Sequence, residues 1–458
     1  MHGPSRAPFR SNAAPVLAFA CQSPQPPPRF LAMKPIVLLA CAAFVVTPAS
    51  ATPPDPMARI ARILKVTPLI DGHNDWAEVL REREGEGRWS IDLRRGLGDR
   101  PIPYNTDIAR LRQGMVGGQF WSVWVDAGLP PLEQVKETLE QIDLVKDIVA
   151  RYPETFELAR TAADVRRIHK AGRIASLIGV EGGNQIADSL SVLRAYHDLG
   201  AGYLTLTHSK TIEWADSATD NPRHDGLTPY GEAVVHELNR LGMLVDLSHV
   251  SEATMRDALR VSRAPVIFSH SGARALDDHP RDVSDDVLRL VAANDGVVMV
   301  NFALAYVSDD YRRWASDKHA EEARFNAPPF GGLYIGQPAR AADAMREWLA
   351  AHPAPKVTLA QVADHVEHIA RTAGVDHVGI GSDFDGVDND LPQGLQDVSQ
   401  YPSLLAELLR RGWSDADIAK VAGGNILRVM DRAEIVAGAM KAEPPATVSE
   451  TALDGTKR

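Results

Sequence analysis

Short apolar runs of the β type alternate with helical patterns along most of this chain. Eight such runs occur between residues 66 and 383, and the stretches between them repeat apolar residues every three or four positions, as amphipathic helices do. Strands that alternate with helices pair in parallel through right-handed crossovers. We therefore expect an α/β fold that closes into a (β/α)₈ TIM-type barrel. The expected strands are 66–71, 119–126, 174–181, 203–208, 243–249, 265–270, 296–302 and 377–383.

This pattern predicts one barrel domain over residues 52–436, with two departures from the repeat. Residues 303–356 are too many for a simple connection and contain a helical stretch at 339–351, so we expect a lid-like insertion over the barrel mouth. Residues 437–458 are polar and carry no apolar stretch, which predicts a disordered tail. The other expected helices are 132–149, 190–199, 232–241, 253–259, 286–292, 359–373, 401–410 and 414–422.

Residues 1–51 are expected to hold an upstream extension and a signal peptide. Lys34 is followed by the apolar stretch PIVLLACAAFVV and then by Ala49, Ser50 and Ala51, the order of a cleaved secretory signal. This order predicts that translation starts at Met33 and that the protein is exported, either to the periplasm or out of the cell. The apolar stretch is shorter than the roughly 20 residues that a membrane-spanning helix needs. A lipid anchor at the cysteine of LLAC, residue 41, is a minor alternative.

The chain of 458 residues has a net charge of −11 and two cysteines, Cys21 and Cys41. An acidic protein lacks the basic surface that phosphate contacts require, so the composition argues against nucleic-acid binding. Both cysteines lie before residue 52, which excludes a disulfide or a thiolate metal site in the barrel. A metal bound there must use histidine and carboxylate ligands, and these suit a catalytic zinc site.

Residue types that bind metals stand where several of the apolar runs end. The carboxyl ends of barrel strands converge on one face, so these side chains should surround one site. Two divalent metals held there around a shared carboxylate would activate water, which predicts a hydrolase. The residues are His73 and Asp75 after PLIDG, Glu181 after IASLIGV, His249 after GMLVDLS, His270 after APVIFS and Asp383 after HVGIGS.

Spacing indicates how these ligands are arranged. His73 and Asp75 are two residues apart, so on a strand they face the same way. Glu181 closes a strand that should be buried on both faces, where a carboxylate must be paired or metal-bound. We expect this carboxylate to bridge two metals. His249 and His270 are separated by one strand–helix unit, so they should end neighbouring strands and lie together.

Three further residues, Asp246, His208 and Arg281, are candidates for the same site, and Asp383 has two possible roles there. Asp246 could orient one of the metal-binding imidazoles from behind. Asp383 is either a metal ligand or the general base that takes a proton from water. His208, at the end of YLTLTH, could donate a hydrogen bond to the oxyanion formed on an attacked carbonyl. Arg281, in the loop after the sixth strand, suits the carboxylate of a small substrate.

Seven segments in the same order resemble the membrane (renal) dipeptidase family of zinc peptidases, with this chain as a bacterial exported member. The resemblance implies an amidohydrolase-like (β/α)₈ barrel with two Zn²⁺ per chain. It also implies hydrolysis of the amide bond of small dipeptides, including those with a C-terminal D-residue, by a hydroxide that bridges the metals. The segments are DGHND at 71–75, GVEGG at 179–183, YLTLTHS at 203–209, WADS at 214–217, VDLSHVS at 245–251, PVIFSHS at 265–271 and GIGSDFDG at 379–386.

The same resemblance implies a ligand set for each metal. His73 and Asp75 would bind one zinc ion, and His249 and His270 would bind the other. Glu181 would bridge the two ions.

Roles for the remaining site residues also follow from the resemblance. Asp383 would be the acid/base residue, and His208 would stabilise the tetrahedral intermediate. Arg281 would contact the carboxylate of the dipeptide. The chain departs from mammalian relatives at Lys210, which stands where they carry a cysteine. A homodimer of this protein is therefore expected to lack an intersubunit disulfide.

Two other functions are compatible with the ligand pattern. A related binuclear amidohydrolase would act on cyclic amides, lactones or phosphoesters, but such enzymes typically begin with H-x-H and bridge their metals with a modified lysine. This chain has His73 and Asp75 in an H-x-D pattern, and Glu181 in place of the lysine. A non-catalytic metal-binding barrel is disfavoured, because the chain keeps Asp383 and His208 together with all the expected ligands.

Overall fold

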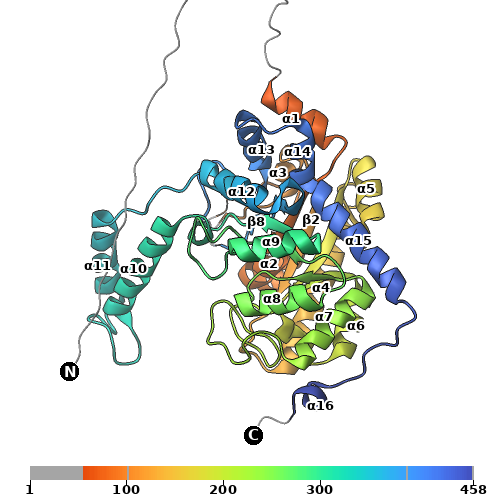
Figure 1. Ribbon diagram of the computed structural model, residues 1–458. Helices are drawn as coiled ribbons and strands as arrows, with labels where there is room; N and C mark the ends of the chain where they lie inside the picture. Colours follow the sequence, from red (N-terminus) through yellow and green to blue (C-terminus); the bar gives the residue numbers. More distant parts are fainter. Residues whose placement is uncertain (1–54, 99, 101–102, 388–389, 456–458) are drawn as a thin grey trace, which may run out of the picture. The chain divides into compact units, whose positions relative to one another are not determined.

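Parallel strands form a closed barrel in the computed structural model, which describes residues 55–98, 100, 103–387 and 390–455 (Figure 1). The sheet closes because β2 pairs with β1 on one side and with β4 on the other. Each strand pairs with its neighbours in parallel, as the alternation with helices predicts. The strands are β1 Leu69–Asn74, β2 Val116–Trp124, β3 Phe156–Leu158, β4 Ile174–Glu181, β5 Ala201–Thr205, β6 Leu244–Asp246, β7 Ile267–Phe268, β8 Val297–Val300 and β9 Val378–Ile380.

The eight predicted strands correspond to β1, β2 and β4 to β9, and the predicted (β/α)₈ barrel is confirmed. Most of them are shorter than predicted, because the backbone leaves the sheet before the polar residues at the strand ends. β3 was not predicted. It pairs with Ile174–Ser176 at the start of β4, before β5 takes over the same edge at Ile178.

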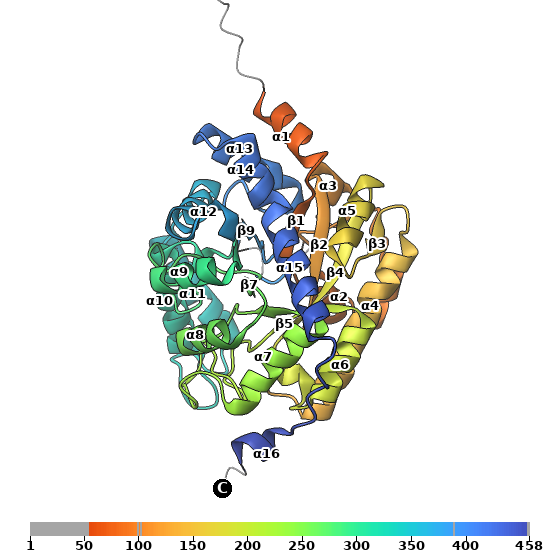
Figure 2. The ribbon, with the colours of Figure 1, turned by 45° about the vertical axis from the view of Figure 1, so that its right-hand side comes forward.

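Helices surround the strands (Figure 2). Three have the predicted limits, at residues 190–199, 359–373 and 401–410. The predicted helix 414–422 is instead α14 followed by a π-helical turn, Lys420–Gly424, that leads into α15. The helices are α1 Pro56–Leu64, α2 Trp76–Glu84, α3 Ile108–Gln113, α4 Pro131–Arg151, α5 Ala162–Lys170, α6 Leu190–Leu199, α7 Pro229–Leu241, α8 Glu252–Val261, α9 Asp285–Asn294, α10 Asp309–Asn326, α11 Pro338–Ala351, α12 Leu359–Ala373, α13 Tyr401–Arg410, α14 Asp415–Ala419, α15 Asn425–Met440 and α16 Glu450–Asp454.

The strands are buried on both faces, and β8 shows how. Val297 and Met299 belong to one apolar cluster, which fills the barrel and includes residues of α15. Val298 and Val300 belong to a second cluster, which packs against helices such as α9. Successive side chains of a strand point to opposite faces, so a continuous apolar run is what a strand between the two clusters requires. Burial of β8 on both faces explains its unbroken VVMV sequence.

The 303–356 insertion contributes one residue to the lining of the cavity at the barrel mouth. Its first turn, the 3₁₀ segment Leu304–Tyr306, brings Tyr306 to the cavity at the mouth. Helices α10 and α11 pack against each other and lie beside the barrel (Figure 1), and none of their residues lines that cavity. Arg312 of α10 is held to the loop after β7 by an ion pair with the buried Asp277, at 2.9 Å. A role of these two helices as a lid therefore stays a prediction.

The described part of the C-terminal tail, up to residue 455, has regular structure where a disordered segment was predicted. It contains α16, whose Asp454 accepts a hydrogen bond of 2.9 Å from the backbone N–H of Tyr230 in α7. The backbone carbonyl of Ala446 accepts a hydrogen bond from Arg194 of α6. Polar backbone and side-chain contacts hold this segment. The prediction was based on the lack of an apolar stretch, which says nothing about such contacts.

The predicted signal peptide, the Met33 start and the Cys41 lipid anchor lie outside the described residues. None of the helices in the described part of the chain combines the length and apolar character needed to cross a bilayer.

We expect Gly179→Ala to destabilise the barrel. A Cβ atom at Gly179 in β4 would lie 1.9 Å from Cζ of the fully buried Tyr203 ring, so the ring must shift. Overpacking of this kind costs about 1–3 kcal/mol, which urea unfolding followed by circular dichroism would measure. Gly438→Ala in α15 is the matched control, because a Cβ there meets no atom within 4 Å and alanine favours a helix. Equal stability of the two variants would contradict this packing argument.

Candidate metal centre

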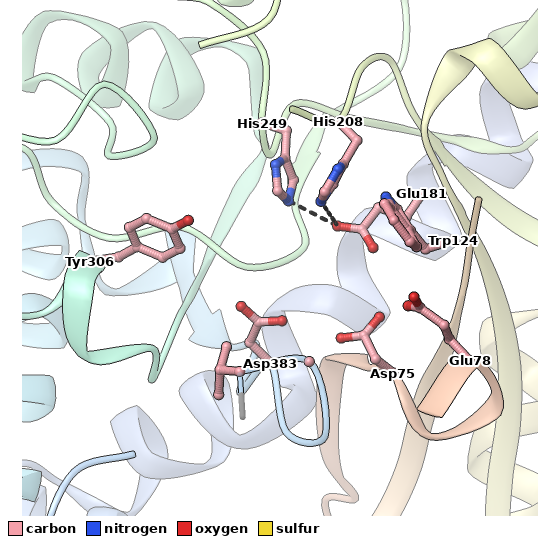
Figure 3. A pocket seen from close by; sticks show the side chains of 10 residues that line it. Asp75, Glu78, Trp124, Glu181, His208, His249, Tyr306 and Asp383 are labelled. Carbon is pink, nitrogen blue, oxygen red and sulfur yellow. Dashed lines mark ion pairs between the residues drawn. The ribbon is translucent and has the colours of Figure 1, made fainter. Parts of the chain in front are cut away.

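The carboxyl ends of the barrel strands bring the predicted metal-chemistry residues to one place. His73 lies near the end of β1, and Glu181 is the last residue of β4. The other predicted side chains follow β1, β5, β6, β7 and β9 within three residues of the strand end: Asp75, His208, His249, His270 and Asp383. Figure 3 shows how these elements direct side chains toward a common cavity.

Glu181 lies at the centre of the group. Its Oε2 atom is 3.3 Å from Nε2 of His73, which is itself 3.3 Å from Oδ1 of Asp75. Its Oε1 atom is 2.8 Å from Nε2 of His249 and 3.3 Å from Nε2 of His270. The two oxygens of one carboxylate therefore face two separate sets of metal-binding atoms, which is the arrangement of a bridging carboxylate.

Buried atoms without hydrogen bonds show that this donor set fits cations. Nε2 of His73 and Oδ1 of Asp75 are buried, and neither has a hydrogen-bond partner in the structure. The Nε2 atoms of His249 and His270 lie only 2.9 Å apart. Converging lone pairs of this kind are costly in a buried site unless a cation binds them. Among the described residues, three triads drawn from this group could each hold a metal ion.

The ionisation of the group also suits metal ligation. Burial favours a raised pKa for Glu181, but the charges and hydrogen bonds of the surrounding histidines outweigh it and hold this pKa well below its usual range. Burial lowers the pKa of His249 well below 6.5, and burial together with the charge of His73 lowers the pKa of His270 to about 4. The carboxylate is thus anionic, and these two imidazoles are neutral, the form that binds metals.

His73 shows where positive charge is most favourable. Burial alone would lower its pKa, but the neighbouring Tyr203, Asp75 and Glu181 outweigh burial and raise the pKa well above its usual value. The electrostatic environment at this ring therefore stabilises a cation.

Polar residues behind the ligands fix their orientation. The Tyr203 hydroxyl is 2.9 Å from Nδ1 of His73, so the Nε2 atom of that ring is the one directed into the site. The Ser269 hydroxyl is 2.8 Å from Nδ1 of His270 and donates a hydrogen bond of 2.6 Å to Asp246. Asp246 therefore supports His270 through a serine. A hydrogen bond to the ring nitrogen that does not face the site fixes the tautomer and the ring orientation of a metal-binding histidine.

Sequence reasoning missed three of these supports: Tyr203, Ser122 and Asn301. Ser122 donates a hydrogen bond of 3.1 Å to Oε2 of Glu181. Asn301 donates one of 3.0 Å to Oδ2 of Asp383. A signal for Asn301 was present, because this polar residue directly follows the apolar β8, one of the two predicted strands to which no site residue had been assigned.

Two site residues adopt an uncommon backbone conformation. His249 has a φ of 67° and Asp383 a φ of 66°. This left-handed region disfavours residues with a side chain, and strain of this kind persists where surrounding contacts compel it, often at functional sites. Both residues turn the chain sharply after a strand, which aims their side chains into the barrel mouth.

A cavity of about 290 Å³ opens directly onto the group. Its walls include His208, whose side chain is 24% exposed and whose ring lies 5.1 Å from that of Trp124. Five of the lining residues were not predicted as site residues: Glu78, Trp124, Tyr306, Gly386 and Val387. The complete lining is Asp75, Glu78, Trp124, Glu181, His208, His249, Tyr306, Asp383, Gly386 and Val387.

Arg281 lies beside this cavity but does not line it. The guanidinium donates hydrogen bonds to the Ser271 hydroxyl and to the backbone carbonyl of His270, and it lies 5.1 Å from the centre of the Tyr306 ring. The side chain is only 1% exposed, and no carboxylate of a described residue lies within ion-pairing distance. Its Nε atom also lacks a hydrogen-bond partner. Arg281 is thus a buried cation next to the one lining residue that the insertion supplies.

Comparisons with known proteins identify the family of this chain. The family model for membrane dipeptidases (peptidase family M19) matches residues 57–444. Dipeptidase aclJ of Aspergillus oryzae is 41% identical over 388 residues, which cover 82% of this chain and 81% of that protein. The probable dipeptidase PvdM from Pseudomonas aeruginosa has a similar structure, with a TM-score of 0.68 and 26% identity over 83% of this chain and 99% of that one.

A metallo peptidase from Rhodobacter sphaeroides, solved with a phosphinate mimic of the dipeptide L-Ala-D-Ala, is also similar. Its TM-score is 0.64, with 25% identity over 80% of this chain and 99% of that one. The family match extends over the whole barrel and includes every predicted site residue. The chain therefore belongs to the membrane dipeptidase family of metallopeptidases, as its motifs predicted.

Proposed function

We propose that this protein is a dipeptidase that uses two zinc ions to hydrolyse the single amide bond of a dipeptide. The observation that carries the proposal is the central position of Glu181, whose two oxygens face two different sets of metal-binding atoms. Family membership supports the reaction class, and the absence of cysteine after residue 41 leaves histidine and carboxylate ligands, which zinc accepts.

The residues divide into two ligand sets. His73 and Asp75 would hold one ion with Oε2 of Glu181, and His249 and His270 would hold the other with Oε1. Two zinc ions bound there would activate a water molecule for attack and polarise the scissile carbonyl.

Two residues are proposed to act on protons and charge during hydrolysis. Oδ2 of Asp383 is held by Asn301, which leaves Oδ1 to take a proton from the attacking water and pass it to the leaving amine. Nε2 of His208 lies 3.8 Å from Glu181 at the cavity wall, from where it can donate a hydrogen bond to the oxyanion.

The substrate carboxylate is proposed to bind at the side of the cavity formed by Tyr306 and Arg281. Arg281 has no ion-pair partner among the described residues, and a free carboxylate would supply one. Because Tyr306 separates the guanidinium from the cavity, we expect its side chain to shift when the substrate binds. Acceptance of a C-terminal D-residue is supported by the L-Ala-D-Ala mimic bound to the Rhodobacter sphaeroides peptidase.

The amidohydrolase alternative, with lactones, cyclic amides or phosphoesters as substrates, receives less support. Such sites use a lysine as the bridging ligand, and no lysine is among the residues that line the described cavity. We also propose that the protein is exported from the cytoplasm, because residues 33–51 resemble a secretory signal. A homodimer of this protein would lack an intersubunit disulfide, because no cysteine follows Cys41.

A substrate panel with and without a chelator tests the proposed reaction. We expect the purified protein to hydrolyse L-Ala-L-Ala and L-Ala-D-Ala, to lose this activity with a chelator, and to regain it with added zinc. A dipeptide amide, which lacks the C-terminal carboxylate, should be cleaved at least about tenfold less efficiently because Arg281 loses its partner. Hydrolysis of a lactone or a phosphotriester without cleavage of any dipeptide would support the amidohydrolase alternative instead.

Glu181→Gln tests the bridging role. The amide keeps the shape of the side chain but removes the charge shared by both ligand sets, so we expect fewer than two zinc ions per chain and no measurable turnover. Elemental analysis of the purified variant measures the metal content, with Glu82→Gln on the exposed part of α2 as the control for loss of one acidic charge. Two bound zinc ions and normal activity in Glu181→Gln would rule out the bridge.

Asp383→Asn tests whether Asp383 acts as the acid/base residue or as a metal ligand. An asparagine can still accept a hydrogen bond but cannot take a proton at neutral pH, so kcat should fall at least about a hundredfold. The metal content should stay at the wild-type value. A loss of bound metal in this variant would instead identify Asp383 as a ligand.

A further inference from the structure

The two sides of the cavity carry opposite charge. Figure 3 shows Tyr306, the neighbour of the Arg281 guanidinium, on one side of the cavity and Glu78 on the other. Asp383, Asp75 and the metal-binding group lie between these two sides. A cavity with a buried cation behind one wall, metal-binding residues in the middle and a carboxylate at the opposite wall matches the charge distribution of a dipeptide zwitterion.

Glu78 is a carboxylate that the metal centre does not use. It belongs to none of the triads of described residues that could hold a metal. It lies in the first turn of α2, three residues after Asp75, and is half-buried at the cavity wall. Burial and the nearby carboxylates Asp75, Glu82 and Glu181 raise the pKa of Glu78 well above its usual value, so a cation beside this side chain would be stabilised.

Glu78 also has no structural partner in the described part of the chain. It makes no hydrogen bond or ion pair there, whereas Glu84 at the other end of the same helix is paired with Arg100 at 2.7 Å. A glutamate in the first turn can cap its helix, but the backbone N–H of Asp75 at the start of α2 donates to the carbonyl of Phe384 instead. Capping and internal ion pairing therefore do not explain this side chain.

We propose that Glu78 binds the α-ammonium group of the amino-terminal residue of the substrate. The proposal rests on the dipeptidase function above and names the group that selects substrates with a free amino end. The α-ammonium is one carbon away from the scissile carbonyl, and Glu78 is one helical turn away from the metal ligand Asp75. A basic side chain would carry its charge several bonds further from the reacting carbonyl, so this position favours the α-ammonium.

The zwitterion then spans the cavity in one direction. Its carboxylate lies toward Tyr306 and Arg281, its ammonium toward Glu78, and the amide bond lies over the metal-binding group. The reverse orientation would place the substrate carboxylate against Glu78 and the substrate ammonium toward the Arg281 guanidinium, so each end would meet a like charge. Glu78 thus contributes to both substrate choice and substrate direction.

Glu78→Gln tests the proposal with two substrates that differ in one group. L-Ala-L-Ala carries the ammonium, and propionyl-L-Ala is the same molecule without its amino group. For L-Ala-L-Ala we expect kcat/KM to fall about 10- to 100-fold, mainly through KM, because a charge-assisted hydrogen bond is lost. The value for propionyl-L-Ala, low in the wild type, should change less than about twofold. Glu347→Gln, at an exposed position of α11 away from the cavity, should leave both values unchanged.

Other outcomes overturn the inference in distinguishable ways. Equal losses on both substrates, or a loss of bound zinc, would make Glu78 part of the catalytic or metal site. A loss confined to L-Lys-L-Ala, measured beside L-Ala-L-Ala, would show that Glu78 binds a basic side chain. An active wild type with an unaffected Glu78→Gln variant would overturn only this inference. A wild type that cleaves no dipeptide, and does not bind a phosphinate dipeptide mimic in calorimetry, would overturn the proposed function as well.

Discussion

The burial of the Glu181 carboxylate is the constraint on which the rest of the site depends. The side chain is 4% exposed and anionic, and a buried charge is tolerated only when opposite charge and hydrogen bonds compensate it. The surrounding imidazoles of His249 and His270 are neutral, so they offer lone pairs more readily than positive charge. Cations bound between them would compensate the negative charge of the carboxylate and accept the lone pairs of the imidazoles. The binding free energy of the ions would then also stabilise the fold.

The barrel strands fix the positions of the residues that surround Glu181. The ligands come from the carboxyl ends of four strands, β1, β4, β6 and β7, so the spacing of parallel strands sets the distances between ligands. Close packing of side chains inside the barrel fixes the orientation of the ligand side chains. The bare backbone of Gly179 gives room to the Tyr203 ring, and the Tyr203 hydroxyl in turn orients His73. The left-handed turns at His249 and Asp383 complete the arrangement.

The sequence was most informative where burial and polarity conflict. A histidine or carboxylate directly after an apolar strand has few explanations, so the barrel and residues such as Glu181 and His270 were predictable. Glu78 was not, because a glutamate in the first turn of a helix is ordinary, and only its missing partner sets it apart. Arg281 was assigned to the correct loop, but its burial behind Tyr306 depends on a segment without a regular pattern. The contacts of Ala446 and Asp454 near the C-terminus are isolated polar contacts, which a search for periodic apolar residues does not detect.

Anomalous scattering from a crystal grown with zinc tests the central claim most directly. Data collected on both sides of the zinc absorption edge locate the ions without any assumption about activity. We expect two peaks about 3.5–4 Å apart. One should lie beside His73 and Asp75 and the other beside His249 and His270, each in contact with one oxygen of Glu181. A single peak, or two peaks of which one does not contact this carboxylate, would contradict the account.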